Sequence, residues 1–340
     1  MLGRWIGIAV VAACVATQAR AATLVNGAGA TFPYPLYSKW FDEYHKRNPD
    51  AQINYQSIGS GGGIRQILEG TVDFGATDGP MNDEQMGQAK TPILHIPTVL
   101  GAVVPTYNVA GVERLRFTPQ ALAGIFLGTI TQWNDPAIAK ENPGVKLPAE
   151  AIVPMHRSDG SGTTYVFTDY LSKVSPEWKE KVGKGTAVNW PVGLGGKGNE
   201  GVSGLVKQTP NSIGYVELIY AVQTKLAYGE VKNRAGKYVV PTLESVTAAA
   251  AAASRNMPAD FRVSITDPDG ADAYPIASFT WLLVPTRIAD AAKGKVLKEF
   301  LTWMLGDGQA LAAPLNYAPL PATVVALERT AIEGIQVGAR

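Results

Sequence analysis

Val72-Asp73-Phe74-Gly75-Ala76 is a short, mainly apolar stretch that is followed closely by a single acid, Asp78. Its length and its apolar side chains predict a strand that is buried on both faces, as in a parallel sheet. It follows two alternations of strand and helix, and this β-α-β-α-β order predicts parallel strands with right-handed crossovers. Asp78 then lies just past the carboxyl end of a strand, where sheets of this class bind ligands.

The segments before this strand supply the other elements of a first unit. Leu36, Trp40 and Tyr44 recur at every fourth residue, which is typical of an amphipathic helix. The predicted elements are, in order, a strand at 24–25, a tight turn at 27–30, a helix over 35–47, a strand over 52–56, a glycine-rich turn at 59–63 and a helix from 64 to 68.

Two strongly apolar strands, at 99–107 and 276–284, flank the middle of the chain. Between and after them we predict a helix over 119–126, a strand over 152–155, a helix from about 163, a surface loop at 193–198, a helix around the six alanines of 248–253 and a helix that contains 297–304. This arrangement predicts a discontinuous domain I (22–107 and 276–340) and an inserted domain II (108–275). A chain that crosses twice between domains forms a hinge.

The N-terminus reads as a secretory signal peptide over residues 1–21. Arg4 precedes an uncharged apolar run, and Ala19-Arg20-Ala21 matches a small-x-small cleavage pattern. The run is too short to span a bilayer of ~30 Å hydrocarbon. The alternative is a lipoprotein signal ending at Cys14, the only cysteine of the chain, which would leave the Ala19–Ala21 pattern without a purpose. We expect ordinary cleavage and an exported protein.

Composition argues against several classes of partner and cofactor. Lys and Arg number 30 against 29 Asp and Glu, so nucleic acid and broad membrane-surface binding lack the concentrated positive charge that they require. The three histidines and the acids show no metal-ligand spacing, and we expect neither a metal nor a cofactor. The dinucleotide fingerprint fails at Gly27-Ala28-Gly29, where the sixth position is Phe32, and no Gly-x-x-x-x-Gly-Lys-Ser/Thr phosphate loop occurs.

Three segments place a Gly/Ser/Thr-rich turn before a helix: 27–32, 59–63 and 159–163. A helix start exposes N–H groups that have no partner and carries the positive end of the helix dipole. Glycine lets an anion approach the backbone, and a hydroxyl adds a donor, so such turns bind phosphate or sulfate readily. Each turn alone is also an ordinary helix cap. Three of them on one chain favour an anion site.

Arg157 and Asp159 stand directly before the third turn. A guanidinium group fits two oxygens of a tetrahedral anion, although a surface ion pair is the ordinary alternative for an arginine. Asp159 either pairs with Arg157 and orients it or caps the following helix, and the two roles are compatible.

Asp78 bears on which anion is bound. A carboxylate can accept a hydrogen bond from the proton that HPO4(2−) retains, whereas sulfate has no proton at neutral pH. Burying the carboxylate without a partner would cost roughly 1–3 kcal/mol or more. Asp78 therefore favours phosphate over sulfate or molybdate, unless it is only a turn residue before Gly79-Pro80.

Other functions fit less well. An enzyme with Ser161 as nucleophile would need a base, and His156 is expected to point away from the site while His45 lies on a solvated helix face and His95 has a structural place. Ser161 also lacks the Gly-x-Ser-x-Gly pattern of hydrolases. An adhesin would leave the three turns and Arg157 without a role.

Taken together, these segments resemble the periplasmic phosphate-binding proteins of bacterial phosphate ABC transporters. The resemblance covers nearly the whole chain after residue 21. Its distinctive segments are 27–33, 55–63, 72–78, 157–163, 190–198 and 213–217.

This resemblance implies an α/β, two-domain periplasmic-binding-protein fold of type II. Each domain has a mixed, mostly parallel sheet flanked by helices, and the ligand lies in the interdomain cleft. It implies a monomeric, non-enzymatic periplasmic protein that binds inorganic phosphate and serves the permease and ATPase subunits of an ABC transporter. The implied phosphate ligands are Thr31, Phe32, Ser60, Asp78, Arg157, Ser161, Gly162 and Thr163, with Asp159 supporting Arg157.

Overall fold

The computed structural model describes residues 22–338. The predicted signal peptide at 1–21, and with it the alternative of lipidation at Cys14, lies outside the described residues. Within them, no helix is long and apolar enough to cross a membrane.

A nine-stranded mixed sheet runs through the described part of the chain, in the order β2-β1-β3-β12-β4-β8-β6-β7, with β9 paired to β4. Its strands are β1 (Thr23–Gly29), β2 (Ala51–Ser57), β3 (Phe74–Thr77), β4 (Ile93–Asn108), β6 (Val153–Arg157), β7 (Leu194–Gly196), β8 (Ser212–Glu217), β9 (Ala227–Tyr228) and β12 (Ala277–Pro285). β1 pairs in parallel with both β2 and β3, which confirms the sheet predicted from the β-α-β-α-β order. β12 pairs antiparallel with β3, and β4 pairs antiparallel with β12.

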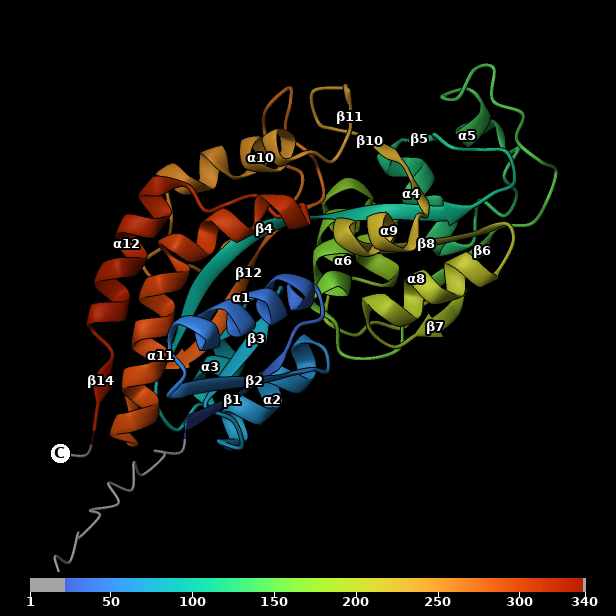
Figure 1. Cartoon of the computed structure of the whole chain (residues 1–340). Helices are drawn as coiled ribbons and strands as arrows, with labels where there is room; N and C mark the ends of the chain where they lie inside the picture. Colours follow the sequence, from blue (N-terminus) through green and yellow to red (C-terminus); the bar gives the residue numbers. More distant parts are fainter. Residues whose placement is uncertain (1–21, 339–340) are drawn as a thin grey trace, which may run out of the picture.

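β4 links two lobes of the molecule. Its residues Ile93–Ala102 pair with β12, and its residues Val103–Asn108 pair with β8. Figure 1 shows β4 running from the end of the molecule that carries β1–β3 and β12 to the end that carries β6–β8. We call the part with β1–β3 and β12 the first lobe and the part with β6–β8 the second lobe.

Helices cover the sheet in both lobes (Figure 1). The first lobe carries α1 (Tyr34–Arg47), α2 (Ser60–Glu69), α3 (Asp83–Gly87), α11 (Ala291–Met304), α12 (Ala322–Glu333) and the short 3-10 helices η1 (Asp307–Leu311) and η2 (Ala313–Leu315). The second carries α4 (Pro119–Leu127), α5 (Pro136–Ala139), α6 (Gly162–Val174), α7 (Pro176–Lys181), α8 (Gly198–Gln208) and α9 (Leu218–Thr224). Small outlying sheets are formed by β5 (Arg116–Phe117), β10 (Glu230–Lys232) and β11 (Tyr238–Val239), and by β13 (Arg287–Ile288) and β14 (Gln336–Val337).

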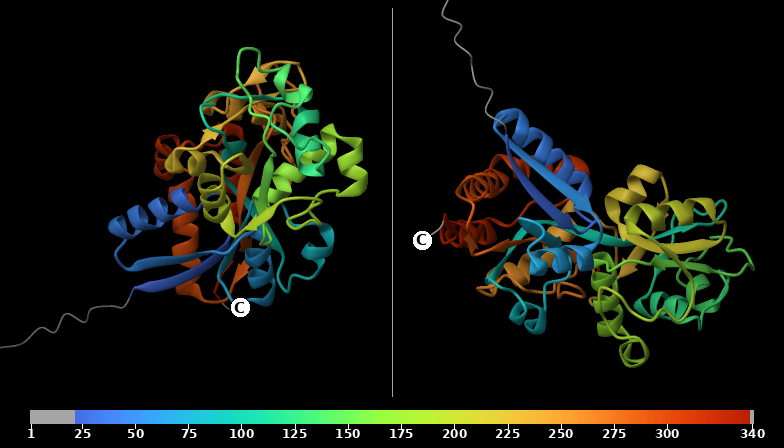
Figure 2. Two further views of the ribbon diagram at one scale, coloured as in Figure 1. Left: turned by 90° about the vertical axis from the view of Figure 1, so that its right-hand side faces the viewer. Right: turned by 90° about the horizontal axis from the view of Figure 1, so that it is seen from below.

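Both ends of the described chain belong to the first lobe. Figure 2 shows the blue and red segments side by side and the green and yellow segments in the other lobe. The division into 22–107 with 276–340 and 108–275 follows this layout and stays a prediction in its boundaries. One element that it assigns to the inserted part, α10 (Leu243–Arg255), packs against β12 and α12.

Aromatic side chains fill the core of each lobe. In the first lobe the helix face predicted at Leu36, Trp40 and Tyr44 is buried, as expected for an amphipathic helix. In the second lobe Phe167 stacks on Tyr215 with ring centroids 4.4 Å apart. These interiors hold the strand ends and helix starts that carry the candidate site.

Three glycine-rich segments differ from the sequence-based expectation. Residues 27–29, predicted as a turn, end β1; most of 59–63, also predicted as a turn, forms the first turn of α2; and 193–198, predicted as a loop, contains β7 and the start of α8. These glycines permit close packing. A Cβ at Gly27 would overlap the ring of Phe74, and one at Gly63 would overlap the backbone of Gly29.

Candidate functional site

Three helix starts bring unpaired backbone donors together. Thr31 and Phe32 lie between β1 and α1, Ser60 opens α2, and Gly162 and Thr163 open α6. Within residues 22–338 the N–H groups of these five residues donate no hydrogen bond. The first N–H groups of a helix have no partner in their own helix, so they are available to a ligand.

The second and third of these helix starts touch each other across the lobes. The Gly61 N–H donates to the Gly160 carbonyl at 2.9 Å. A Cβ added at Gly162 would overlap both Ser60 Oγ and Asp78 Oδ2. The predicted residues Ser60, Asp78 and Gly162, which are far apart in the sequence, are therefore in direct contact.

Asp78 is buried at this meeting point, with 1% of its surface exposed. Its Oδ1 accepts a hydrogen bond of 2.7 Å from Thr280 Oγ1, and its Oδ2 has no partner within the described chain. Burial raises the pKa of Asp78 to about 7, although the Thr280 hydrogen bond and the charge of Arg157 act in the opposite direction. An unpartnered buried acceptor is costly, so Asp78 Oδ2 requires a donor that residues 22–338 do not supply.

Arg157 ends β6 and is buried on the second-lobe side of this meeting point. Its Nε and Nη2 donate to the two carboxylate oxygens of Asp159, at 2.8 and 2.6 Å. Asp159 Oδ1 also accepts from the Gly198 N–H at 3.0 Å. Burial alone would raise the pKa of Asp159, but its bonds to Arg157 and Gly198 hold it below its ordinary value. The ion pair is thus internal, and it fixes the guanidinium plane.

The hydroxyls of Ser60 and Ser161 accept different backbone hydrogen bonds. Ser60 Oγ accepts from the Asp78 N–H at 3.2 Å, which leaves its hydrogen free. Ser161 Oγ accepts from the Thr164 N–H at 3.0 Å and caps α6. Asp159 is therefore not the helix cap, an alternative that the sequence had left open. The Ser161 N–H donates to the Thr186 carbonyl, so the hydroxyl hydrogen is the one donor of Ser161 that remains available.

Sequence reasoning missed three residues that hold the site. Thr280, on the mainly apolar strand β12, donates to Asp78. Tyr220, on α9, donates to the Thr31 carbonyl at 2.5 Å. Asn199, on α8, donates to Thr31 Oγ1 at 2.7 Å. Each acts through contacts between segments distant in sequence. A hydroxyl inside an apolar strand is the one local signal, and Ser278 shares it with Thr280.

The assembled groups are complementary to a small oxyanion. Free N–H groups, hydroxyl hydrogens and the Arg157 guanidinium supply donors, while Asp78 Oδ2 is an acceptor among them. Such a set suits a tetrahedral anion with several ionised oxygens and one proton. Among the described residues there is no cluster of three or more His, Cys, Asp or Glu side chains that could hold a metal ion.

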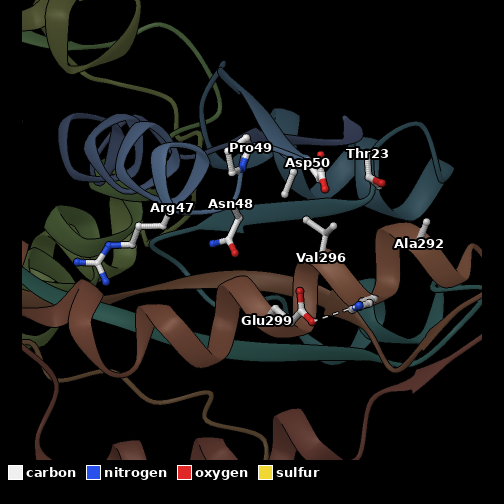
Figure 3. A pocket seen from close by; sticks show the side chains of 10 residues that line it. Thr23, Arg47, Asn48, Pro49, Asp50, Ala292, Val296 and Glu299 are labelled. Atoms are coloured by element: carbon white, nitrogen blue, oxygen red, sulfur yellow. Dashed lines mark ion pairs between the residues drawn. The ribbon is translucent and has the colours of Figure 1, made fainter. Parts of the chain in front are cut away.

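A surface pocket of about 470 Å³ lies elsewhere in the first lobe (Figure 3). It is formed between the end of α1, the start of β2 and α11, and its lining includes Lys295 and Glu299, which pair at 3.8 Å one turn apart on α11. Its lining residues include none of the predicted anion ligands. Its mixed charges set it apart from the donor-rich site between the lobes.

Comparisons with known proteins identify the family of the chain. Residues 15–308 match the model of the PBP superfamily domain. The chain is 48% identical to the phosphate-binding protein PstS of Xylella fastidiosa strain Temecula1, over 88% of this chain and 82% of that protein. It is 45% identical to the PstS of Pasteurella multocida, over 89% and 88% of the two chains.

Solved structures share the fold. A high-affinity periplasmic phosphate-binding protein with bound phosphate superimposes with a TM-score of 0.72 at 22% identity, over 91% of this chain and 93% of that one. A phosphate-binding protein from Stenotrophomonas maltophilia gives a TM-score of 0.68 at 21% identity, over 91% and 94%. This likeness confirms the two-lobed, mixed α/β binding-protein architecture.

Proposed function

The chain belongs to the PstS family of phosphate-binding proteins, and we propose that it binds one inorganic phosphate ion between its lobes for uptake through a phosphate ABC transporter. The proposed ligands are those expected from the sequence. Thr31, Phe32, Ser60 and Asp78 come from the first lobe, and Arg157, Ser161, Gly162 and Thr163 come from the second. Asp159 orients Arg157 through its two hydrogen bonds.

The observation that carries this proposal is the buried, unpartnered Asp78 Oδ2 beside Ser60 and Gly162. HPO4(2−) or H2PO4(−) brings the missing donor, since either keeps a proton on oxygen. The remaining oxygens accept from the free N–H groups, the hydroxyls and Arg157. Phosphate thereby satisfies both the donors and the one acceptor.

The same acceptor supports selectivity against sulfate. A sulfate ion of the same shape has no proton at neutral pH, so one of its oxygens would face Asp78 Oδ2 directly. Two acceptors in contact in a dry site repel each other, and neither is hydrogen-bonded. Because the pKa of Asp78 is raised only to about 7, protonation of the carboxyl becomes costly above neutral pH. Discrimination should therefore be greatest there.

The setting of this activity follows from the family and the N-terminal pattern. We propose export by the signal peptide at 1–21, action in the periplasm as a monomer, and delivery of phosphate to the membrane permease, which works with the transporter's ATPase subunits. Domain I (22–107 and 276–340) and domain II (108–275) would close on the ion and together present the surface that the permease recognises.

A receptor fits the described residues better than a hydrolase does. Ser161 Oγ is engaged as a helix cap. His156 stacks on Trp190 and its Nδ1 lies 3.0 Å from the Arg157 carbonyl, while His95 Nε2 accepts from the Met81 N–H. His45 Nδ1 lies 2.7 Å from the Ala51 carbonyl. None of these rings bonds Ser161, so the chemistry of a base-activated nucleophile is not assembled.

Isothermal titration of the purified protein with inorganic phosphate tests the proposal. We expect one-to-one binding, and we expect Arg157→Ala to weaken it by at least about 100-fold because a buried charge-assisted contact is lost. Arg116→Ala is the matched control, since Arg116 forms an exposed ion pair with Glu230 at 3.2 Å and should bind as the wild type does. Absence of phosphate binding by the wild type would refute the proposed function, and an unchanged Arg157→Ala would place the anion elsewhere.

A further inference from the structure

Asn199 is a buried amide at the start of α8 that contacts both lobes at the proposed phosphate site. Its side chain is fully buried. Its Nδ2 lies 2.7 Å from Thr31 Oγ1, which belongs to the first lobe, and 3.1 Å from Thr163 Oγ1, which belongs to the second. One amide group therefore joins two proposed phosphate ligands across the boundary between the lobes.

The orientation of this amide is fixed from behind. Asn199 Oδ1 accepts a hydrogen bond of 2.9 Å from the backbone N–H of Glu217, at the end of β8. An amide has an acceptor on one side and two donors on the other, so an oxygen held by Glu217 leaves the NH2 group facing the threonines. Each of its two hydrogens then meets one threonine hydroxyl.

The two threonine oxygens have no acceptor capacity left. Thr31 Oγ1 accepts from Asn199 Nδ2 and also from the Asn199 backbone N–H at 3.3 Å. Thr163 Oγ1 accepts from Asn199 Nδ2 and from Arg157 Nη1 at 3.4 Å. A hydroxyl offers two lone pairs and one hydrogen, so only the hydrogen of each hydroxyl remains free. Within residues 22–338 neither hydroxyl donates to a protein acceptor.

We propose that Asn199 is a positioning residue that makes Thr31 and Thr163 act only as donors, aims both hydroxyl hydrogens at the bound ion, and ties the lobes together in the closed state. This inference rests on the proposed phosphate site. It also gives Asn199 a part in selectivity, because neither threonine hydroxyl can accept the proton of the ligand, for which Asp78 Oδ2 has a free acceptor site.

The test is a mutant cycle read out by isothermal titration with inorganic phosphate. In the wild-type background, Asn199→Ala should weaken binding at least about 10-fold, since directed donors and the tie between the lobes are lost. In a Thr31→Val, Thr163→Val background the same substitution should change affinity less than about 3-fold, because the amide no longer has hydroxyls to orient. An equal loss in both backgrounds, or no loss in either, would overturn the proposal.

Asn142 provides a matched control. It is also a buried asparagine whose Oδ1 accepts a backbone N–H, from Arg116 at 2.8 Å, and whose Nδ2 donates to two oxygens, but it lies outside the proposed site. Asn142→Ala should keep wild-type phosphate affinity. If the wild type itself gives no phosphate heat, the proposed function fails, which is a different result from an unaffected Asn199→Ala.

Thermal unfolding of the ligand-free proteins keeps the cycle interpretable. If Asn199→Ala does not fold, Asn199→Leu takes its place, because leucine fills a similar volume and leaves no cavity. If neither Asn199→Ala nor Asn199→Leu folds, the role of Asn199 is purely structural, and this outcome also overturns the proposal.

Discussion

Asp78 and Arg157 are the two buried charged side chains on which the site depends, and their surroundings differ. Arg157 is neutralised within the protein by Asp159, at 2.6 Å, so its charge is already compensated before any ligand arrives. Among the residues that the structure describes, Asp78 has a hydroxyl donor on one oxygen and no donor on the other. The site is thus incomplete at Asp78, and the ligand must complete it.

This incompleteness should be measurable as a loss of stability in the ligand-free protein. Burial raises the pKa of Asp78 from 3.8 to about 7. At about 1.4 kcal/mol per pKa unit this shift corresponds to roughly 4 kcal/mol. The group is neutral in both folded and unfolded states below the unfolded pKa, so the cost is absent there. The cost grows as the pH rises from the unfolded pKa of 3.8 to the folded pKa of about 7, and it is complete above the folded pKa.

We therefore expect Asp78→Asn, which keeps the shape but cannot ionise, to be more stable than the ligand-free wild type at pH 8, by up to roughly 4 kcal/mol. The difference should shrink toward zero near pH 4. Chemical denaturation without phosphate at both pH values measures it. The exposed Asp50→Asn serves as the control and should change stability little. A variant that is no more stable than the wild type at pH 8 would contradict the buried, uncompensated carboxylate.

At the residue scale, the sequence identified the candidate ligands but not the side chains that surround them. Two local patterns predicted ligand binding: a strand end followed by Asp78, and Arg157 beside a Gly/Ser/Thr turn. Asn199, Tyr220 and Thr280 were not, because each acts through a partner between 168 and 202 positions away in the chain. No local pattern identifies such a distant partner.

Helix starts and glycines decide the site at the scale of elements. Residues 59–63 were expected to turn, yet Ser60 already opens α2. Gly59 takes up the bend instead, with φ at 89°, a conformation that favours glycine. Composition alone does not separate a glycine that bends the chain from one that lets two segments approach closely. The same ambiguity explains why residues 27–29 and 193–198 were assigned wrongly.

Gly162 provides a test of close approach between the lobes. A methyl group at this position would overlap Ser60 Oγ and Asp78 Oδ2 on the other lobe. We expect Gly162→Ala to lower phosphate affinity at least about 100-fold, because the lobes could not close fully on the ion. The isolated helix α6 should tolerate the change, since alanine is a better helix former than glycine.

The matched control is Gly204→Ala on α8, where an added Cβ has nothing within 4 Å. It should stabilise the protein by roughly 0.5–1 kcal/mol and leave phosphate affinity unchanged. Equilibrium dialysis with labelled phosphate compares the two variants. Wild-type affinity in Gly162→Ala would show that the contact between Gly162 and the first lobe is not needed for binding.

At the scale of the whole molecule, the chain joins its lobes at several places. β4 takes part in both halves of the sheet. The segment with Ser264 and Thr266, which leads back to the first lobe, is hydrogen-bonded to α6. Asp169 of α6 accepts from both hydroxyls at 2.6 Å each and forms an ion pair with Lys184. Burial would raise the pKa of Asp169, but these bonds hold it at about 2. The connection therefore stays charged and paired at physiological pH.

The two-lobed plan was predictable because apolar strands and their order are encoded locally, while the contacts that close the lobes are not. Alternating strands and helices fixed the parallel order of β1, β2 and β3. The position of α10 against α12 could not be foreseen, since an alanine-rich helix carries few side chains that specify what it packs on.

The central claim, that Asp78 lets a two-lobed site recognise a protonated oxyanion, is tested most directly by the ratio of phosphate to sulfate affinity. Calorimetric titration of the wild type and of Asp78→Asn with each anion at pH 8 measures this ratio. We predict that the wild type binds phosphate and gives no heat with sulfate, and that Asp78→Asn loses less in phosphate affinity than it loses in discrimination. Equal affinity of the wild type for both anions, or undiminished discrimination in Asp78→Asn, would contradict it.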